Sequence, residues 1–247
     1  MIVVMRKSNI ILIGLIFALL LAIYSLNSGT GQKASTAGNG MTEKSVNKEE
    51  SIWQAVIVDA GHGGEDPGKV SSYSELKEKD LNLQIAFNVK QLLEEANYKV
   101  IMTREEDKLV YSEGTTGIYE KRKQDLTRRK SIMDNGGADI AVSIHMNSYE
   151  ESICYGAQTF YPSGSTESEK LATCIQDTMR EMLDKGNKRE PQLKKDPIVI
   201  LVDLKTPTTI VECGFLSNPE EEKKLGTEEY QQKISAAIKA GVDKYFK

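Results

Sequence analysis

The chain contains only two histidines, and each follows a short apolar run. His62 lies in the segment DAGHGG, directly after Ala55–Asp59, and His145 ends the run Asp139–His145. Short apolar runs rich in β-branched residues predict buried parallel strands. In open α/β sheets the ligand crevice forms beyond the carboxyl ends of such strands. A lone histidine there is usually structural, but two histidines in equivalent positions predict a shared metal site.

A third ligand is expected, because catalytic zinc usually takes three protein ligands and leaves a fourth position open. Glu78 is the best candidate. It precedes Leu81 by three residues and Ile85 by seven, so it belongs to the apolar stripe of the helix that follows. Glu78 should therefore face inward, whereas Lys77 and Lys79 should face outward.

Neighbouring acids offer alternatives to Glu78 as the third ligand. Glu75 is expected to precede the helix, and Glu65 and Asp66 fall in a loop that could hold substrate. Glu78 could itself serve only as a partner of the helix dipole. The spacing alone leaves these alternatives open.

Glu212 ends a third predicted strand, Thr208–Glu212, with the sequence TTIVE. It could be a structural acid, but a carboxylate in this place is costly to bury without a use. We expect it to move protons beside the metal ligands, as a general base and acid does.

Other polar residues near these segments have weaker predictions. Asp59 could orient His62 or cap the loop after the strand. Asn147 and Arg104 could contact substrate, although surface salt bridging is the commoner use of an arginine. The glycines around His62 allow a sharp turn and should leave room for a large substrate.

Strands and helices alternate along the rest of the chain. The predicted strands are 55–59, 98–103, 139–145, 157–161 and 208–212, and the predicted helices are 79–96, 120–135, 167–183 and 228–245. This alternation predicts a single α/β domain, with a central, mostly parallel twisted sheet and helices on both faces.

Composition narrows the class of protein. A formal net charge of −4 over 247 residues argues against nucleic acid as the partner. Cys154, Cys174 and Cys213 are odd in number and lack metal-binding spacing, so small buried thiols are expected, with a Cys154–Cys174 bridge as the alternative.

The N-terminal region has the pattern of a targeting segment. Arg6 and Lys7 precede the uncharged apolar run Ile10–Leu26. We therefore predict a signal peptide or signal anchor over 1–27, a flexible linker over 28–51 and a catalytic domain over 52–247. The body should be exported, and either secreted or anchored on the outer face of the membrane.

Four motifs in the chain resemble those of a known family. DAGHGG, EKDLNL, SIHMN and VECGFLSNPEE follow the order found in the zinc-dependent N-acetylmuramoyl-L-alanine amidases of the third amidase class. The resemblance runs from Ala55 to the C-terminus. It implies one Zn²⁺ ion on His62, Glu78 and His145, with Glu212 as the catalytic carboxylate. The implied reaction is hydrolysis of the amide between the muramic acid lactyl group and L-alanine in peptidoglycan.

Within that family the chain is most similar to germination-specific enzymes of the spore cortex, through its short body and the segment YGAQTFY. This likeness implies muramic-δ-lactam formation in the developing spore together with a separate deacetylase. A protein activator is a further expectation. Cys213 departs from the Val or Thr expected there, and 185–196 does not align. The alternatives are a stem-peptide carboxypeptidase or endopeptidase, and a non-catalytic wall-binding module that holds zinc.

Overall fold

The computed structural model describes residues 53–195 and 198–247, which belong to one compact unit. The predicted targeting segment and linker therefore lie outside the described residues. In the part of the chain that is described, no helix is both long and apolar enough to cross a membrane.

A six-stranded sheet in the order β2-β1-β3-β6-β4-β5 forms the centre of the domain. The first four strands in this order run parallel, β4 is antiparallel to β6, and β5 is parallel to β4. The mostly parallel sheet predicted from the sequence is thus confirmed. The strands are β1 (Ala55–Ala60), β2 (Lys99–Met102), β3 (Ile140–Asn147), β4 (Gln158–Tyr161), β5 (Gln192–Leu193) and β6 (Thr208–Phe215).

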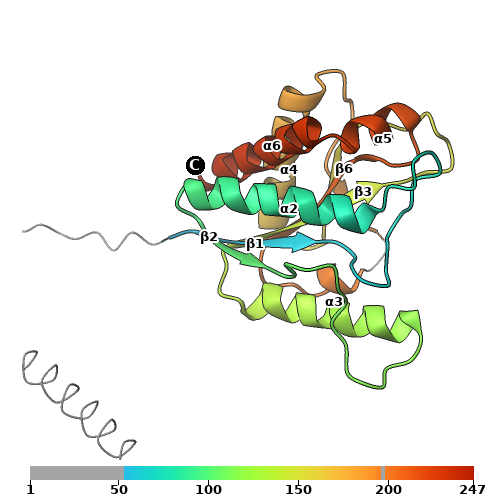
Figure 1. The fold of residues 1–247 in the computed structure, drawn as a ribbon. Helices are drawn as coiled ribbons and strands as arrows, with labels where there is room; N and C mark the ends of the chain where they lie inside the picture. The colour runs from blue at the N-terminus through green and yellow to red at the C-terminus, as the bar shows by residue number, and fades with distance from the viewer. Residues whose placement is uncertain (1–52, 196–197) are drawn as a thin grey trace, which may run out of the picture. The chain divides into compact units, whose positions relative to one another are not determined.

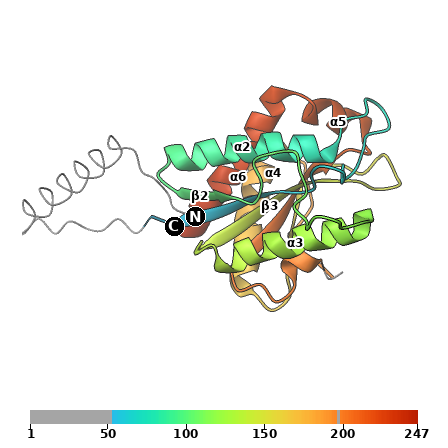
Figure 2. The ribbon, with the colours of Figure 1, turned by 60° about the horizontal axis from the view of Figure 1, so that its bottom comes forward.

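Helices cover both faces of this sheet (Figure 1, Figure 2). On one face, α6 (Glu228–Phe246) contacts both α2 (Glu78–Glu95) and α4 (Thr166–Leu183). On the other face lie α3 (Ile118–Asn135) and the short 3₁₀ helix η1 (Val199–Leu201).

The sequence of β1 explains these two layers, because successive side chains of a strand point to opposite faces. Val56 and Val58 join the core under α2, α4 and α6, whereas Ile57 packs with Met133 of α3. A strand that is buried on both faces must be apolar throughout, as this one is.

The predicted elements are all present, with ends that differ by up to three residues. Prediction missed β5, η1 and the seven-residue helix α5 (Pro219–Leu225). All three cysteines are free, so the alternative of a Cys154–Cys174 bridge is wrong in this structure. Cys174 and Cys213 are buried and Cys154 is partly exposed.

The strand register brings the chemically capable residues to one edge of the sheet. β1 and β3 pair with Ala60 beside Ile144, and β3 and β6 pair with His145 beside Glu212. His62 follows β1 by two residues. Because the carboxyl ends of parallel strands meet at the same edge, the three side chains share one region.

Candidate metal centre

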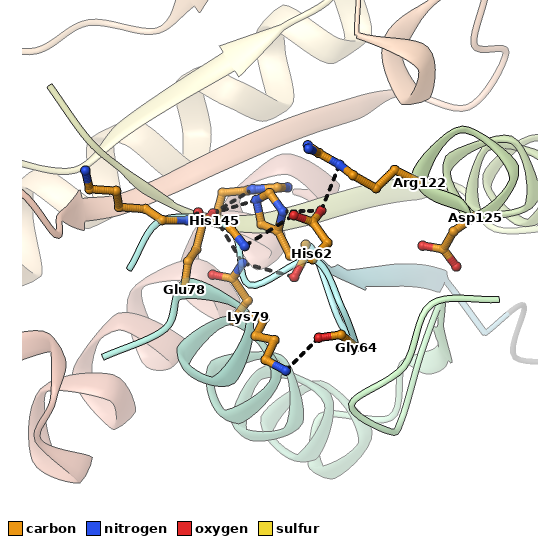
Figure 3. A network of polar contacts seen from close by, with 12 residues as sticks. His62, Gly64, Glu78, Lys79, Arg122, Asp125 and His145 are labelled. Carbon is orange, nitrogen blue, oxygen red and sulfur yellow. Dashed lines mark hydrogen bonds and ion pairs between the residues drawn. The ribbon is translucent and has the colours of Figure 1, made fainter. Parts of the chain in front are cut away.

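Three predicted residues come together at this edge. His62, Glu78 and His145 each offer one ligand atom, and these atoms lie within 4.8 Å of one another. Glu78 Oε1 is 3.2 Å from His62 Nε2 and 3.0 Å from His145 Nδ1. The two imidazole rings meet edge to face, with centroids 5.0 Å apart (Figure 3). Two imidazole nitrogens and a carboxylate oxygen form a ligand set that catalytic zinc uses.

His62 is fixed in an uncommon backbone conformation. Its φ of 62° lies in the left-handed region, which a non-glycine residue adopts at a cost. The guanidinium of Arg129 donates a 2.7 Å hydrogen bond to the His62 carbonyl. Asp66 Oδ2 contacts His62 Nδ1 at 2.8 Å, which leaves Nε2 directed at Glu78.

Asp66, and not Asp59, is therefore the carboxylate that orients His62. The prediction for Asp59 is wrong in this respect. Its carboxylate instead accepts hydrogen bonds from Arg129, Ser143 and Thr103, all within the protein interior.

Glu78 begins α2, and only 4% of it is exposed. Its Oε2 accepts a 2.8 Å hydrogen bond from Lys69 N, and its Oε1 accepts a 3.1 Å bond from Met146 N. These bonds aim the carboxylate at the histidines. Of the rival acids, Glu75 lies before the helix as predicted, and Glu65 pairs with Lys121.

Lys79 does not face outward, and that prediction is wrong. Its ammonium group donates to Gly64 O at 2.8 Å and to Asp107 Oδ2 at 2.6 Å. The side chain thus ties the first turn of α2 to the loop that carries His62. Helical spacing alone does not reveal a loop that folds over the helix.

The charges of the three residues are strongly coupled. Burial alone would lower the pKa of His62, but hydrogen bonds to Asp66 and Glu78 raise that pKa to about 9. Burial alone would raise the pKa of Glu78, but the His145 and His62 rings hold it well below its usual range. The site thus favours positive charge beside the Glu78 carboxylate. A bound cation would take the place of the imidazole protons, because ligands bind metal deprotonated.

Glu212 completes the site from β6. Its Oε2 atom is buried and has no hydrogen-bond partner among the described residues. Burial raises the pKa of this carboxyl, and the nearby Glu78 charge adds to the effect, while the histidines oppose it. An unpaired buried carboxylate oxygen is costly, and its presence beside His145 points to a role in chemistry.

A pocket of about 320 Å³ opens over these groups, between the sheet and α3. His62, His145 and Glu212 form part of its polar lining. Apolar side chains from four segments form another wall, namely Leu109, Leu126, Ile198, Ile200 and Ile210. The pocket can therefore exclude water from one side of a bound substrate.

The sharp turn predicted for the glycines around His62 is confirmed by the positive φ of Gly63 (140°) and Gly64 (55°), but glycine near the ligands also meets a second requirement. A Cβ on Gly61 would lie 2.2 Å from His145 Cε1. A Cβ on Gly68, whose φ is +65°, would lie 2.5 Å from Glu78 Oε2. The space beside these glycines is filled by the candidate ligands themselves, so the prediction of room for substrate is wrong at Gly61. Sequence reasoning did not single out Gly68.

Arg104 has a structural role, so its predicted contact with substrate is wrong. It is 3% exposed and donates to four backbone carbonyls, those of Ala60, Gly61, Lys79 and Glu106, at 2.8 to 3.1 Å. Asn147 is partly exposed at the end of β3, and its contact with substrate stays a prediction.

Arg129 is a positioning residue that the sequence analysis missed. It is 1% exposed and pairs with Asp59 at 2.9 Å and with Asp125 at 2.6 Å. Together with its bond to the His62 carbonyl, these contacts fix α3 to β1 and to the loop after it. The four-residue spacing of Asp125 and Arg129 on one helix was the available signal.

Comparison with known proteins places these residues in a family context. A family model described as N-acetylmuramoyl-L-alanine amidase matches residues 56–244. The germination-specific N-acetylmuramoyl-L-alanine amidase of Bacillus subtilis is 37% identical over 191 residues, which cover 77% of this chain and 79% of that protein.

Solved structures show the same fold. The CwlD amidase of Clostridioides difficile, in complex with the GerS lipoprotein, is 43% identical with a TM-score of 0.76, covering 78% of this chain and 98% of that chain. An N-acetylmuramoyl-L-alanine amidase from Clostridium difficile 630 is 31% identical with a TM-score of 0.68, covering 79% and 98%.

Proposed function

This chain belongs to the N-acetylmuramoyl-L-alanine amidase family, and on that premise we propose that it is a zinc-dependent peptidoglycan hydrolase. It cuts the amide between the lactyl group of N-acetylmuramic acid and the L-alanine of the stem peptide. The observation that carries the proposal is the convergence of His62, Glu78 and His145 beside the buried, unpaired Oε2 atom of Glu212.

His62, Glu78 and His145 would hold one zinc ion. The chemistry that zinc supplies when bound is polarisation of a carbonyl and acidification of water. Asp66 keeps the Nδ1 side of His62 engaged, so that Nε2 is presented to the ion. Gly61 and Gly68 leave the space that the ligand side chains need.

Glu212 would move the proton. It takes a proton from the attacking water as the water oxygen bonds to the amide carbon, and it delivers that proton to the L-alanine nitrogen as the C–N bond breaks. Burial favours the protonated form of this carboxyl and so suits it to hold the proton between the two steps. General acid–base help of this kind contributes roughly 10²–10⁴-fold in rate.

Two other functions could use the same residues. A stem-peptide carboxypeptidase or endopeptidase would share the metal chemistry but cut a different amide. A wall-binding module that holds zinc structurally would need a closed set of four ligands. The cluster in the described residues has three, with Glu212 left unpaired beside it, which favours catalysis.

The proposed setting is the spore cortex. The likeness to the germination-specific enzyme of Bacillus subtilis supports a part in muramic-δ-lactam formation, in sequence with a separate deacetylase. The apolar run near the N-terminus supports export, with residues 1–27 as signal or anchor and 28–51 as linker. The CwlD neighbour was solved in complex with the GerS lipoprotein, which supports a protein partner here, and an activating role for that partner is part of the proposal.

The test is incubation of the purified protein with cortex peptidoglycan, with and without a chelator, followed by mass analysis. We expect intact stem peptides with a free L-alanine amine, and no product after chelation. Peptides cut at an internal amide would indicate a peptidase instead. Full turnover by the protein alone would exclude a required activator.

Glu212→Gln tests the role of the carboxylate. We expect this variant to bind one zinc ion per chain, as the wild type does, and to lose roughly 10²–10⁴-fold in rate. Glu181→Gln makes the same change at an exposed position of α4 and should retain full activity. Normal cutting by Glu212→Gln would show that this residue does not transfer the proton.

A further inference from the structure

An exposed arginine lies at the mouth of the pocket, one carboxylate away from the candidate metal ligands. Arg122 projects from α3, and its Nε is 3.1 Å from Asp66 Oδ2, the same oxygen that contacts His62 Nδ1. Figure 3 shows the Arg122 side chain extending from α3 toward His62. Arg122 lines the pocket together with His62, His145 and Glu212.

The guanidinium of Arg122 has N–H donors that no described residue engages. Asp66 engages its Nε side, and within the described residues neither Nη group makes an ion pair or hydrogen bond. The paired Nη groups form the end of the guanidinium fork, which matches a carboxylate in bidentate geometry. The side chain is 47% exposed, so these donors are accessible from the pocket.

The other arginine of the pocket lining and the lysine next to Arg122 are engaged by other partners. Arg129 is buried and divided between Asp59 and Asp125. Lys121, next to Arg122 in the chain, pairs with Glu65 at 2.6 Å and lies over the Tyr111 ring. Arg122 is therefore the arginine of the pocket lining whose charge is accessible, and we expect an anion in the pocket to bind to it.

The proposed substrate has one carboxylate close to the bond that is cut. The second stem residue, D-glutamate, continues the peptide through its side-chain carboxyl, so its α-carboxylate is free. A single L-alanine separates this group from the scissile nitrogen, a reach of about 6 Å. Arg122 is separated from the His62 ring only by the Asp66 carboxylate that contacts both. A carboxylate about 6 Å from the scissile nitrogen could therefore reach its guanidinium.

We infer that Arg122 binds the free α-carboxylate of the second stem residue and makes the enzyme specific for stems that carry the acid over stems that carry the amide. The inference rests on the proposed function for the orientation of the stem peptide. It adds a specificity-determining residue to the site.

The test is calorimetric binding to the zinc-loaded protein of L-alanyl-D-glutamate γ-methylamide, with either a free α-carboxylate or an α-carboxamide. We expect the wild type to bind the acid about 10-fold more tightly than the amide, as one charge-assisted pair allows. Arg122→Gln should remove the preference, and Arg122→Lys should keep part of it because it retains the charge.

Lys123→Gln is the matched control, since it removes the same charge from the adjacent exposed residue of α3, which is outside the pocket lining. It should keep the wild-type preference. Equal binding of both peptides by the wild type, or binding of neither, would overturn the inference. An equal loss for both peptides in Arg122→Gln, with a fall in zinc content, would also overturn it and assign Arg122 to the support of Asp66.

Turnover separates this inference from the proposed function. On peptidoglycan with unamidated stems, KM should rise about 10-fold in Arg122→Gln with little change in kcat. If the wild type cut another amide yet retained the peptide preference, the proposed reaction would fail and the Arg122 site would stand.

Discussion

At the scale of single residues, the site is organised around one carboxylate and the partners that hold it. Glu78 receives both imidazoles and the backbone N–H groups of Met146 and Lys69. These contacts come from separate segments of the chain, so the carboxylate is placed before any ion arrives. Prepositioned ligands of this kind raise metal affinity because little reorganisation remains.

Asp66 controls the basicity and orientation of His62, which gives a first prediction at this scale. Asp66→Asn removes the negative charge that faces Nδ1 at 2.8 Å. We expect zinc affinity to fall roughly 10–100-fold, as is usual for the loss of a partner behind a metal-ligating histidine. Competition with a chelator of known affinity measures the change.

Asp80→Asn makes the same chemical change at an exposed position in the first turn of α2. Its zinc affinity should equal that of the wild type. Wild-type affinity in Asp66→Asn would instead limit Asp66 to holding the loop and Arg122.

Residue type made the candidate ligands predictable, because rare histidines at strand ends and an acid on an apolar stripe are visible in a sequence. The residues that hold these ligands in place could not be predicted in the same way. That Asp66 reaches His62 depends on the positive φ at His62, which spacing does not encode. The need for glycine at Gly68 depends on Glu78 packing against it.

At the scale of elements, α3 and β1 are joined through buried charge. Arg129 reaches from α3 to Asp59 on β1, and both side chains are 1% exposed. Burial alone would raise the pKa of Asp59, but Arg129 and the Ser143 and Thr103 hydroxyls lower it to about 2. Removing one partner of such a pair leaves the other charge buried and uncompensated.

This pair predicts a loss of stability in acid. The pKa of Asp59 in the folded protein is about 2, below the value of about 3.9 for an unfolded chain. The stabilisation is therefore complete above pH 4 and is lost as the pH falls toward 2. We expect Asp59 to contribute about 2 kcal/mol to the fall in unfolding free energy over that range.

Urea unfolding of the wild type and Asp59→Asn between pH 6 and 2 measures this contribution. The variant should be less stable at neutral pH and should lose less stability in acid than the wild type. Equal pH dependence in the two proteins would contradict the assignment, whatever the other carboxyl groups contribute.

The types of the elements were predictable from the spacing of apolar residues and from composition. The long helices repeat apolar residues every three to four positions, and the buried strands are continuous apolar runs. The missed elements are short. α5 spans seven residues, although Asn218 caps it with its side chain and Pro219 begins it. β5 has two exposed residues and depends on pairing with β4. Such elements form because of their neighbours, and local sequence says little about them.

At the scale of the whole molecule, the candidate ligands connect parts of the chain that are distant in sequence. His62 follows β1, Glu78 opens α2 and His145 lies on β3, so a bound ion would join helix α2 to two segments of the sheet. An ion that binds only the folded protein stabilises it by mass action. The site should therefore affect global unfolding as well as catalysis.

Thermal unfolding with zinc and with excess chelator tests this expectation. At a free zinc concentration 100 times the Kd, the folded state gains about 2.7 kcal/mol. For a domain of this size that gain raises Tm by roughly 5–10 °C.

Glu212→Gln should show the same rise, because Glu212 is not a predicted ligand, whereas Glu78→Gln should show little or none. A rise that persisted in Glu78→Gln would mean that zinc binds elsewhere. The absence of a rise in the wild type would mean that the two imidazoles and the carboxylate are held together by their protons alone.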